Sequence, residues 1–411
     1  MKRGHLESNF LVLVTLALVA FGLVMVYSAT SAAAAVGGRD PIYYLKRQAV
    51  FAVLGLIGLI VAARVSYRTL RGLGPSLLVG SLFLLVCVLL IGERVNGARR
   101  WIALGPATFQ PSELAKLALA IWAAAYLARR SAPSSLSELG KPIGVLVGVF
   151  GLLLLLEPDL GTAIVLVMVL AAMLLVSGSP LGLLVRAGSI VTAVGLLAIW
   201  VEPYRRARIF AFVNPWHDSQ GAGFQIVQAM IGLGSGGIFG VGLGQGVQKI
   251  FYLPEAHTDM IAAIIGEELG LVGLAALIAG YAAFGYAGLR IALRCPDPFG
   301  KRLAAGLTAT VCGQATLNLA AVVGIAPLTG IPLPFVSYGG TSLVVILCSV
   351  GILLNIARSS GVAARAELPD RSRGDRRPRP AVARSRGSAE RPRRTSDVRR
   401  VAGSHRGAAR S

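Results

Sequence analysis

The chain has 411 residues, of which 55% are hydrophobic and 14% are charged. A soluble domain cannot bury so large a share of apolar residues, so an ordinary globular enzyme is excluded. The formal net charge is +21, and the segment 358–411 supplies +11 of it, because 16 arginines there face 5 acidic residues. Apolar runs of about 15 to 25 residues recur in the remainder, each long enough to cross a hydrocarbon core of ~30 Å. The composition predicts a polytopic membrane protein with a basic tail.

Ten membrane helices are predicted from the apolar runs and from the Pro, Gly and charged residues that separate them. They lie near residues 10–29, 48–64, 74–92, 112–128, 142–157, 160–177, 181–200, 260–289, 302–325 and 340–357. The expected fold class is therefore all-α, with one multi-pass membrane domain over 1–357. A cleaved signal peptide at the N-terminus is the less favoured alternative, because further spans follow directly.

Basic residues predict that both ends of the chain lie in the cytoplasm. In that orientation the cytoplasmic segments and the tail carry 29 Lys and Arg residues, against 10 on the outer side. The tail, 358–411, has almost no large apolar residues and is expected to be disordered and to lie against anionic lipids of the inner leaflet. The seventh and eighth helices are then joined by a large extracytoplasmic loop, 201–258.

The outer basic residues are clustered rather than scattered. Arg99-Arg100-Trp101 and Arg205-Arg206-Ala207-Arg208 indicate an anionic ligand at the outer leaflet, with lipid headgroups as the alternative. Further along the large loop, the stretch 224–246 mixes aliphatic residues with many glycines. This composition predicts an amphipathic or re-entrant piece on the membrane rather than a full span.

Several ionisable residues fall at span ends or inside spans, where a charge is costly and needs a partner. Glu113 and Lys116 are three residues apart, so they share a helix face and are predicted to pair. Polar groups paired in helices, such as Gln314 with Asn318, more often hold helices together than perform catalysis. Asp159 lies at a junction of two helices, where its carboxylate could answer the outer arginines.

Asp259 is the most informative single carboxylate. It precedes an apolar run, so it or Thr258 could cap the eighth helix. A carboxylate at the boundary between water and hydrocarbon would also have a raised pKa, which suits a general base near neutral pH. His257 and Asp259 are too few to define a metal site, and the four cysteines show neither zinc spacing nor a disulfide framework.

The chain resembles the SEDS family (shape, elongation, division and sporulation), whose members have ten membrane spans. The matching segments are Val95–Ile102, Gln110–Lys116, Glu157–Thr162, Leu253–Asp259, Gly266–Gly270 and Leu333–Ser342. They occur in the family's order and cover nearly all of 10–357, whereas the tail lies outside the resemblance. Asn214-Pro215-Trp216, Val247-Gln248-Lys249 and Ala256 resemble the cell-division branch. Departures at 245–246 and 260–262 leave the sporulation branch as a competitor, and a member of the family that acts in elongation also stays open.

The resemblance implies a peptidoglycan glycosyltransferase that polymerises lipid II, a disaccharide pentapeptide on undecaprenyl pyrophosphate, at the outer leaflet of the bacterial cytoplasmic membrane, and at the division septum. Its catalytic aspartate falls on Asp259. The other residues expected to bind substrate or to line the cavity are Arg47, Arg99, Arg100, Trp101, Glu113, Lys116, Asp159, Lys249, Glu255, His257 and Ser337.

The resemblance also implies a class B penicillin-binding protein as transpeptidase partner, together with other proteins of the division machinery. A divalent cation, Mg or Mn, is expected at the pyrophosphate, although no ligand set is legible, and neither an organic cofactor nor a nucleic acid is expected. Two other functions remain open at this point. The chain could be a lipid II flippase or a secondary transporter, or it could act only as a scaffold for the transpeptidase.

Overall fold

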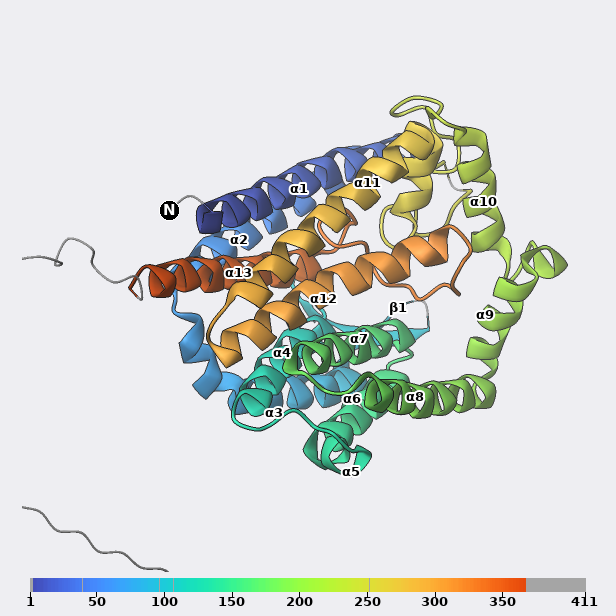
Figure 1. The fold of residues 1–411 in the computed structure, drawn as a ribbon. Helices are drawn as coiled ribbons and strands as arrows, with labels where there is room; N and C mark the ends of the chain where they lie inside the picture. Colours follow the sequence, from blue (N-terminus) through green and yellow to red (C-terminus); the bar gives the residue numbers. More distant parts are fainter. Residues whose placement is uncertain (1–2, 39, 96, 106, 251, 367–411) are drawn as a thin grey trace, which may run out of the picture. The chain divides into compact units, whose positions relative to one another are not determined.

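The computed structural model describes residues 3–38, 40–95, 97–105, 107–250 and 252–366 (Figure 1). Within them the helices are α1 (Arg3–Val36), α2 (Tyr43–Arg64), α3 (Tyr67–Ile91), α4 (Pro111–Ala128), α5 (Leu136–Leu139), α6 (Val145–Leu156), α7 (Leu160–Ser177), α8 (Leu181–Val201), α9 (Pro203–Val213), α10 (Phe224–Gly236), α11 (Ile261–Arg294), α12 (Pro298–Val322) and α13 (Gly340–Ala366). A π-helical turn, Gly140–Gly144, joins α5 to α6, and a 3-10 turn, Pro215–Asp218, follows α9. The strands are β1 (Glu93–Val95), β2 (Ala98–Leu104) and β3 (Ala107–Phe109).

Each of the ten predicted spans corresponds to a helical segment of at least 18 residues, and the all-α membrane fold is confirmed. Eight segments of the described chain are long and apolar enough to cross a membrane: α1, α2, α3, α5 to α6, α7, α8, α11 and α13. The other two, α4 and α12, carry more polar residues. They can do so because each packs among other helices, α4 against α3, α7 and α12, and α12 against α11 and α7.

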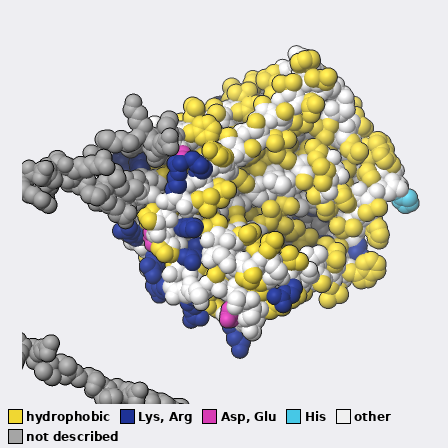
Figure 2. Space-filling view, in the orientation of Figure 1, with side chains coloured by type: hydrophobic (Ala, Val, Ile, Leu, Met, Phe, Trp, Pro, Cys, Tyr) yellow, Lys and Arg dark blue, Asp and Glu magenta, His cyan; other side chains and the backbone are white. Residues whose placement is uncertain are grey.

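The two ends of the helix bundle differ. The start of α1 and the end of α13 lie at one end, here called the terminal end, while α9 and α10 lie at the other, here called the loop end (Figure 1). Figure 2 shows hydrophobic side chains over most of the face in view and Lys and Arg gathered towards the terminal end. Helix α13 continues to Ala366, so helix extends past the predicted tail boundary at 358, and the rest of the predicted tail, 367–411, lies outside the described residues.

The sequence did not predict the small sheet between α3 and α4. Its three strands are antiparallel in the order β1-β2-β3, with Arg94 opposite Arg99 and Ile102 opposite Phe109. Gly97 (φ +81°) and Gly105 (φ +64°) follow β1 and β2, where the chain reverses. The strands are only three to seven residues long, too short for a periodic pattern to stand out beside the neighbouring spans.

The large loop contains α9 and α10. Helix α10 has 13 residues, fewer than the ~20 needed to cross a membrane, in agreement with the predicted amphipathic or re-entrant piece. After it, the chain runs back through glycines and reaches α11, which the sequence predicted as an unbroken helix. The helix is broken at Gly270, whose φ is +65° and ψ −161°.

The glycine-rich segment 237–242 pairs with the backbone of α11 on both sides of that break. Four backbone hydrogen bonds join them, from Val241 to Glu267, from Gly242 to Glu268, from Leu271 to Gly237 and from Val272 to Ile238. A Cβ added at Gly240 or Gly270 would collide with the other segment's backbone, so the close approach requires glycine at both positions. The peptide groups that the break leaves without helical partners are thereby satisfied.

Candidate functional site

A cavity of about 520 Å³ lies at the loop end of the bundle, where the sheet, the large loop and the segments before α11 and α13 meet. Its polar lining consists of Arg47, Arg100, Thr108, Gln110, Arg208, Gln225, Glu255, Thr258, Asp259, Tyr338, Thr341 and Ser342. Trp101, Phe51 and several prolines and glycines supply the apolar wall. A concave, partly apolar space with a few convergent polar groups is the usual form of a small-molecule site.

Asp259 lies on the wall of this cavity, in the loop just before α11. Helix α11 begins at Ile261, and its N-cap, Met260, makes no side-chain cap hydrogen bond, so neither Thr258 nor Asp259 acts as the helix cap. Burial raises the pKa of Asp259 to about 6, the negative charge of Glu255 adds to this rise, and the charge of Arg208 opposes it. A carboxyl group with this pKa is mostly ionised at pH 7 and can still accept a proton.

Thr258 lies between the two acidic side chains of the cavity. Its hydroxyl is 2.8 Å from Oε2 of Glu255 and 3.3 Å from Oδ1 of Asp259. Glu255 is exposed and has a positive φ of 55°, and the amides of Thr258 and Met260 both donate to its carbonyl. The loop is therefore tightly folded around Glu255, and both carboxylates are held near the same space.

Three arginines from three distant parts of the chain line the cavity. Arg47 comes from α2, Arg100 from β2 and Arg208 from α9. Arg100 donates to the carbonyls of Glu157 and Pro158, and Arg208 donates to the carbonyl of Leu328 at 3.2 Å. Backbone carbonyls thus help to fix the orientation of both guanidinium groups, and the positive charge that the three arginines bring to the cavity suits an anionic ligand.

Arg99 and Ser337 were expected in the cavity but are used elsewhere. Side chains alternate along β2, so Arg99 faces away from Arg100 and donates to the carbonyl of Leu89 at the end of α3. The Ser337 hydroxyl is buried and accepts the amide of Leu333, which closes a turn. The residues after it, Tyr338 to Ser342, line the cavity instead.

His257 lies behind the cavity wall rather than in it. Its ring is 4.8 Å from that of Tyr44 and 5.5 Å from that of Tyr338, measured between centroids. Burial lowers the pKa of His257. The histidine therefore packs between two aromatic rings and supports the loop, whose backbone is also held by the amide of Tyr338 donating to the His257 carbonyl at 2.9 Å.

Asp159 caps helix α7 and forms no ion pair with the cavity arginines among the described residues. Its side chain accepts the amide and the hydroxyl of Thr162 at 3.0 and 2.8 Å, at the start of α7. The neighbouring Glu157 is fully buried, and neither of its carboxyl oxygens has a hydrogen-bond partner among the described residues. Burial, and then the charge of Asp159, raise the pKa of Glu157 to about 8, so this side chain is mostly neutral at pH 7.

The predicted pair of Glu113 and Lys116 is confirmed, with 2.8 Å between the ammonium and Oε1 of the carboxylate. Lys116 also donates to Oε1 of Gln314 at 2.7 Å, and Gln314 donates to the carbonyl of Pro332 at 2.9 Å. The pair is fully buried and does not line the cavity. The pair supports the cavity wall through Gln314, because Pro332, whose carbonyl accepts from Gln314, belongs to that wall.

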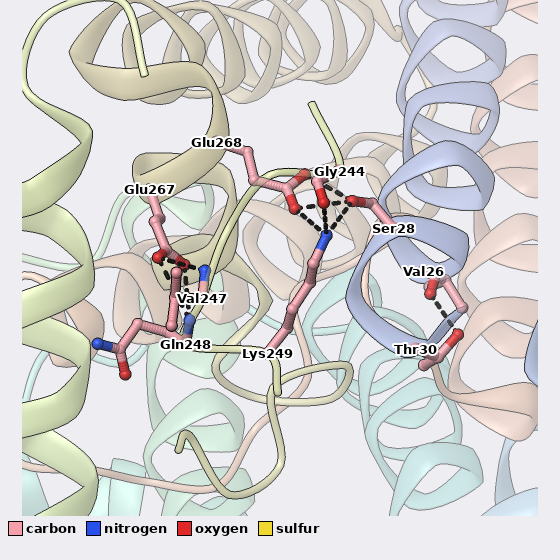
Figure 3. A network of polar contacts seen from close by, with 9 residues as sticks. All are labelled: Val26, Ser28, Thr30, Gly244, Val247, Gln248, Lys249, Glu267 and Glu268. Atoms are coloured by element: carbon pink, nitrogen blue, oxygen red, sulfur yellow. Dashed lines mark hydrogen bonds and ion pairs between the residues drawn. The ribbon is translucent and has the colours of Figure 1, made fainter. Parts of the chain in front are cut away.

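Lys249 was expected to bind substrate and is instead part of a buried network (Figure 3). Its ammonium is 2.6 Å from Oε1 of Glu268 and 2.8 Å from the carbonyl of Gly244. The Ser28 hydroxyl, on α1, donates to Glu268. Beside this group, Glu267 accepts the amides of residues 247 and 248. The network ties the segment after the glycine-rich stretch to α1 and α11.

The residues expected to bind substrate or to line the cavity did not include the following polar residues of its lining: Thr108, Gln110, Arg208, Gln225, Thr258, Tyr338, Thr341 and Ser342. Most of them lie inside or next to motifs and clusters that did carry a signal, but spacing alone does not say which member of a motif faces a ligand. No group of three His, Cys, Asp or Glu side chains that could hold a metal lies in the described part of the chain. Among the residues that line the cavity, the carboxylates that could meet a cation are Glu255 and Asp259.

Comparison with known proteins places these features in a family. A family model described as "Cell cycle protein", covering FtsW, RodA and SpoVE, matches residues 8–361. The probable peptidoglycan glycosyltransferase FtsW of Geobacter sulfurreducens is 43% identical over 350 residues, 84% of this chain and 94% of that protein. Stage V sporulation protein E of Bacillus subtilis is 40% identical over 354 residues, 85% and 96% of the two chains.

Two solved structures share the fold. One is described as showing the structural coordination of polymerization and crosslinking by a peptidoglycan synthase complex; its matching chain has a TM-score of 0.72 and 33% identity, and the match covers 85% of this chain and 97% of that one. The other is the rod shape determining protein RodA of Thermus thermophilus, with a TM-score of 0.63 and 31% identity over 85% and 96% of the chains.

Proposed function

The chain belongs to the family of FtsW, RodA and SpoVE, and from this premise we propose that it is a peptidoglycan glycosyltransferase that polymerises lipid II with Asp259 as general base. The observation that carries the proposal is the cavity itself. One carboxylate with a pKa of about 6 and three arginines from different elements face one space at the loop end. A sugar transfer from a lipid pyrophosphate requires these two kinds of group together.

The reaction follows from the charges of the cavity. The 4-hydroxyl of an acceptor sugar attacks the anomeric carbon of the donor, the new glycosidic bond forms, and the bond from that carbon to the pyrophosphate oxygen breaks. Asp259 takes the hydroxyl proton. Arg47, Arg100 and Arg208 stabilise the negative charge that develops on the departing undecaprenyl pyrophosphate.

In this proposal the expected divalent cation would be bound mainly by the pyrophosphate of the substrate. Mg²⁺ commonly binds one or two carboxylates together with the phosphates of a substrate, keeping several waters. Because the described residues offer no larger set of ligands, any such cation would arrive on the pyrophosphate oxygens. It would neutralise phosphate charge there, and the proposed roles of Asp259 and of the arginines do not depend on it.

The membrane orientation belongs to the proposal as well. Lipid II is polymerised outside the cell, so the loop end with its cavity faces the outer leaflet and the terminal end faces the cytoplasm. The concentration of Lys and Arg at the terminal end supports this orientation through the positive-inside rule (Figure 2). We propose the division septum as the location, with a class B penicillin-binding protein as transpeptidase partner, on the similarity to FtsW and to a peptidoglycan synthase complex.

Flippase or transporter activity is the second candidate, and one observation weighs against it. A transport path needs polar groups near the middle of the membrane that a substrate can reach. The charged pair Glu113 with Lys116 lies instead in the first two turns of α4, which follow the cavity residue Gln110, and both side chains are fully buried. Polymerisation of lipid II by the purified protein in detergent, where no sides of a membrane exist, separates an enzyme from a flippase.

The substitution Asp259→Asn tests the proposal directly. Asn keeps the size of the side chain but cannot accept the proton of the acceptor hydroxyl. Residue 259 does not cap α11, so the substitution should not weaken the start of that helix. We expect polymerisation of lipid II by the purified variant to fall by about two to four orders of magnitude. Thermal unfolding and co-purification with the transpeptidase partner should stay unchanged.

Asp259→Glu is the matched variant, because it keeps the charge and displaces it. We expect it to restore little activity, since a displacement of ~1 Å can cost ~10²-fold in rate. Near-normal polymerisation by Asp259→Asn would contradict the proposal. Glu255 would then be the next carboxylate to test, because it also faces the cavity, whereas Asp159 is occupied as a helix cap.

A further inference from the structure

Asn318 is a buried polar residue to which the proposed reaction gives no role. It lies on α12, one turn after Gln314, and only 2% of its surface is exposed. Its Nδ2 donates to the backbone carbonyl of Asp259 at 2.7 Å and to that of Ile331 at 2.8 Å. Its Oδ1 has no hydrogen-bond partner among the described residues. One amide group therefore ties α12 to two separate loop segments.

Those two segments form the part of the cavity where the carboxylate of Asp259 and the guanidinium group of Arg100 lie on either side of Gly330. Gly330, next to Ile331, lines the cavity with a φ of +70°. A Cβ placed on Gly330 would lie 3.9 Å from Oδ2 of Asp259 and 3.6 Å from Nη1 of Arg100. The position of this short loop against Asp259 thus sets the space between the two charged groups.

The peptide group between Asp259 and Met260 lies outside regular structure and is held by two bonds: its N–H donates to the Glu255 carbonyl at 3.3 Å, and its C=O accepts from Asn318 at 2.7 Å. Asp259 precedes the first residue of α11, Ile261, and the N-cap Met260 makes no side-chain cap bond. The loop before it is held from outside at His257, through the amide of Tyr338. The bond from Asn318 reaches the backbone of Asp259 itself, so it acts on the position of the carboxylate over the shortest distance.

We propose that Asn318 is a positioning residue for glycosyl transfer. Its amide holds the Asp259 and Ile331 carbonyls at one spacing, which keeps the Asp259 carboxylate at the correct distance from the cavity wall beside Arg100. The proposal rests on the proposed role of Asp259 as general base. The two polar side chains of α12 then have different roles. Gln314 holds the cavity wall at Pro332, and Asn318 joins the wall segment at Ile331 to the backbone of Asp259.

Asn318→Leu tests this, because leucine has a similar size and lacks the donor. The carboxylate should become free to shift by ~1 Å, so we expect kcat for lipid II polymerisation to fall by ~10²-fold. The residues that contact the substrate are unchanged, so KM should stay within about twofold. Asn318→Asp, of nearly the same shape and without an amide donor, is the second variant and should show the same loss of kcat.

Asn355→Leu is the matched control for a purely structural role. Asn355, on α13, is also a buried asparagine that joins separate elements, since it donates to the carbonyl of Ala63 at 2.9 Å and accepts the amide of Tyr67 at 3.0 Å. It lies at the terminal end, away from the cavity. We expect this variant to lower the thermal midpoint while kcat and KM measured on folded protein stay normal.

The outcomes separate the two proposals. If the Asn318 variants keep near-normal kcat on folded protein, whatever their thermal midpoint, they behave like the structural control Asn355→Leu and the positioning role is wrong. If Asp259→Asn is inactive and Asn318→Leu is active, the general base stands and only the positioning role fails. If Asp259→Asn is active, the proposed base itself fails, whatever Asn318 does.

Discussion

The cavity and the buried network of Figure 3 both lie near the start of α11, and Lys249 of the network is only ten residues from Asp259 of the cavity. The two regions differ in whether their charged side chains are paired inside the protein or face a space that a ligand can enter. In the network, Lys249 and Glu268 are fully buried and 2.6 Å apart. In the cavity, Arg100 and Asp259 face a common space that a ligand can enter. Charge that is neutralised inside the protein joins segments, whereas charge that faces a cavity can act on a ligand.

The largest effect on stability should come from breaking the network. Lys249→Met and Glu268→Gln each remove one partner, and the charge left in Lys249 or Glu268 remains buried, which typically costs ~3–5 kcal/mol. We expect each single variant to lower the thermal midpoint in detergent strongly. The double variant should recover part of the loss, because it leaves no unpaired charge.

The same double-mutant cycle on Glu113 and Lys116 extends the comparison to a pair inside one helix. We expect non-additive losses there too, since the two side chains touch at 2.8 Å. Strictly additive losses in either cycle would show that the two residues are not energetic partners. Such a result for Lys249 and Glu268 would also remove the contrast drawn here between network and cavity.

The pH dependence of the reaction should follow the cavity alone. With a pKa of about 6, Asp259 is protonated in most molecules at pH 5, so we expect kcat/KM to fall by about tenfold for each pH unit below 6. A raised carboxyl pKa favours the folded state in acid: this contribution to stability is complete below the ordinary pKa of 3.8 and is lost as the pH rises through about 6. Acid should therefore inactivate without unfolding through this group.

Glu255→Gln sharpens the measurement. The charge of Glu255 raises the pKa of Asp259. Its removal should move the acidic limb of the rate profile to lower pH, with Lys249→Met as a variant outside the cavity that leaves the limb in place. An acidic limb that did not move with Glu255→Gln would assign it to another group.

The smallest effect should come from removing residues 367–411. This segment is rich in Arg, Pro, Ser, Ala and Gly and poor in large apolar residues, and it lies beyond the part of the chain that the family model matches. All cavity residues lie between 47 and 342. We expect polymerisation by the truncated chain to stay within about threefold of the full chain, measured on purified protein. A loss as large as that of Asp259→Asn would show that the tail takes part in catalysis.

The sequence predicts the helices of this protein well because each membrane span leaves a long apolar signal. It also predicts the pair of Glu113 and Lys116, since three residues along one helix fix their distance. It misplaces Lys249, whose partner Glu268 lies in another element, and it does not separate Arg99 from Arg100, because the alternation of β2 becomes visible only once the strand is known.

Only part of the cavity was predicted, because local patterns mark single residues but do not show which segments meet. Asp259 could be singled out by its place at the edge of a span, but a helix cap was an equal interpretation until the structure placed the helix start at Ile261. Arg208 belonged to a visible cluster of arginines, and only the position of α9 shows that this member, and neither Arg205 nor Arg206, lines the cavity. Contacts between distant segments are the information that local patterns lack.

The break at Gly270 makes the eighth span depend on the glycine-rich segment 237–242. Residues 271–294 form a continuous apolar helix of about 36 Å, by ~1.5 Å per residue, which is long enough to cross the bilayer, but the amides of its first two residues donate to the carbonyls of Gly237 and Ile238. On the other side of the break, the carbonyls of Glu267 and Glu268 likewise accept from amides of the segment 237–242. The eighth span and the glycine-rich segment therefore complete each other's hydrogen bonds, and the loop that bears Asp259 is the stretch of chain that connects them.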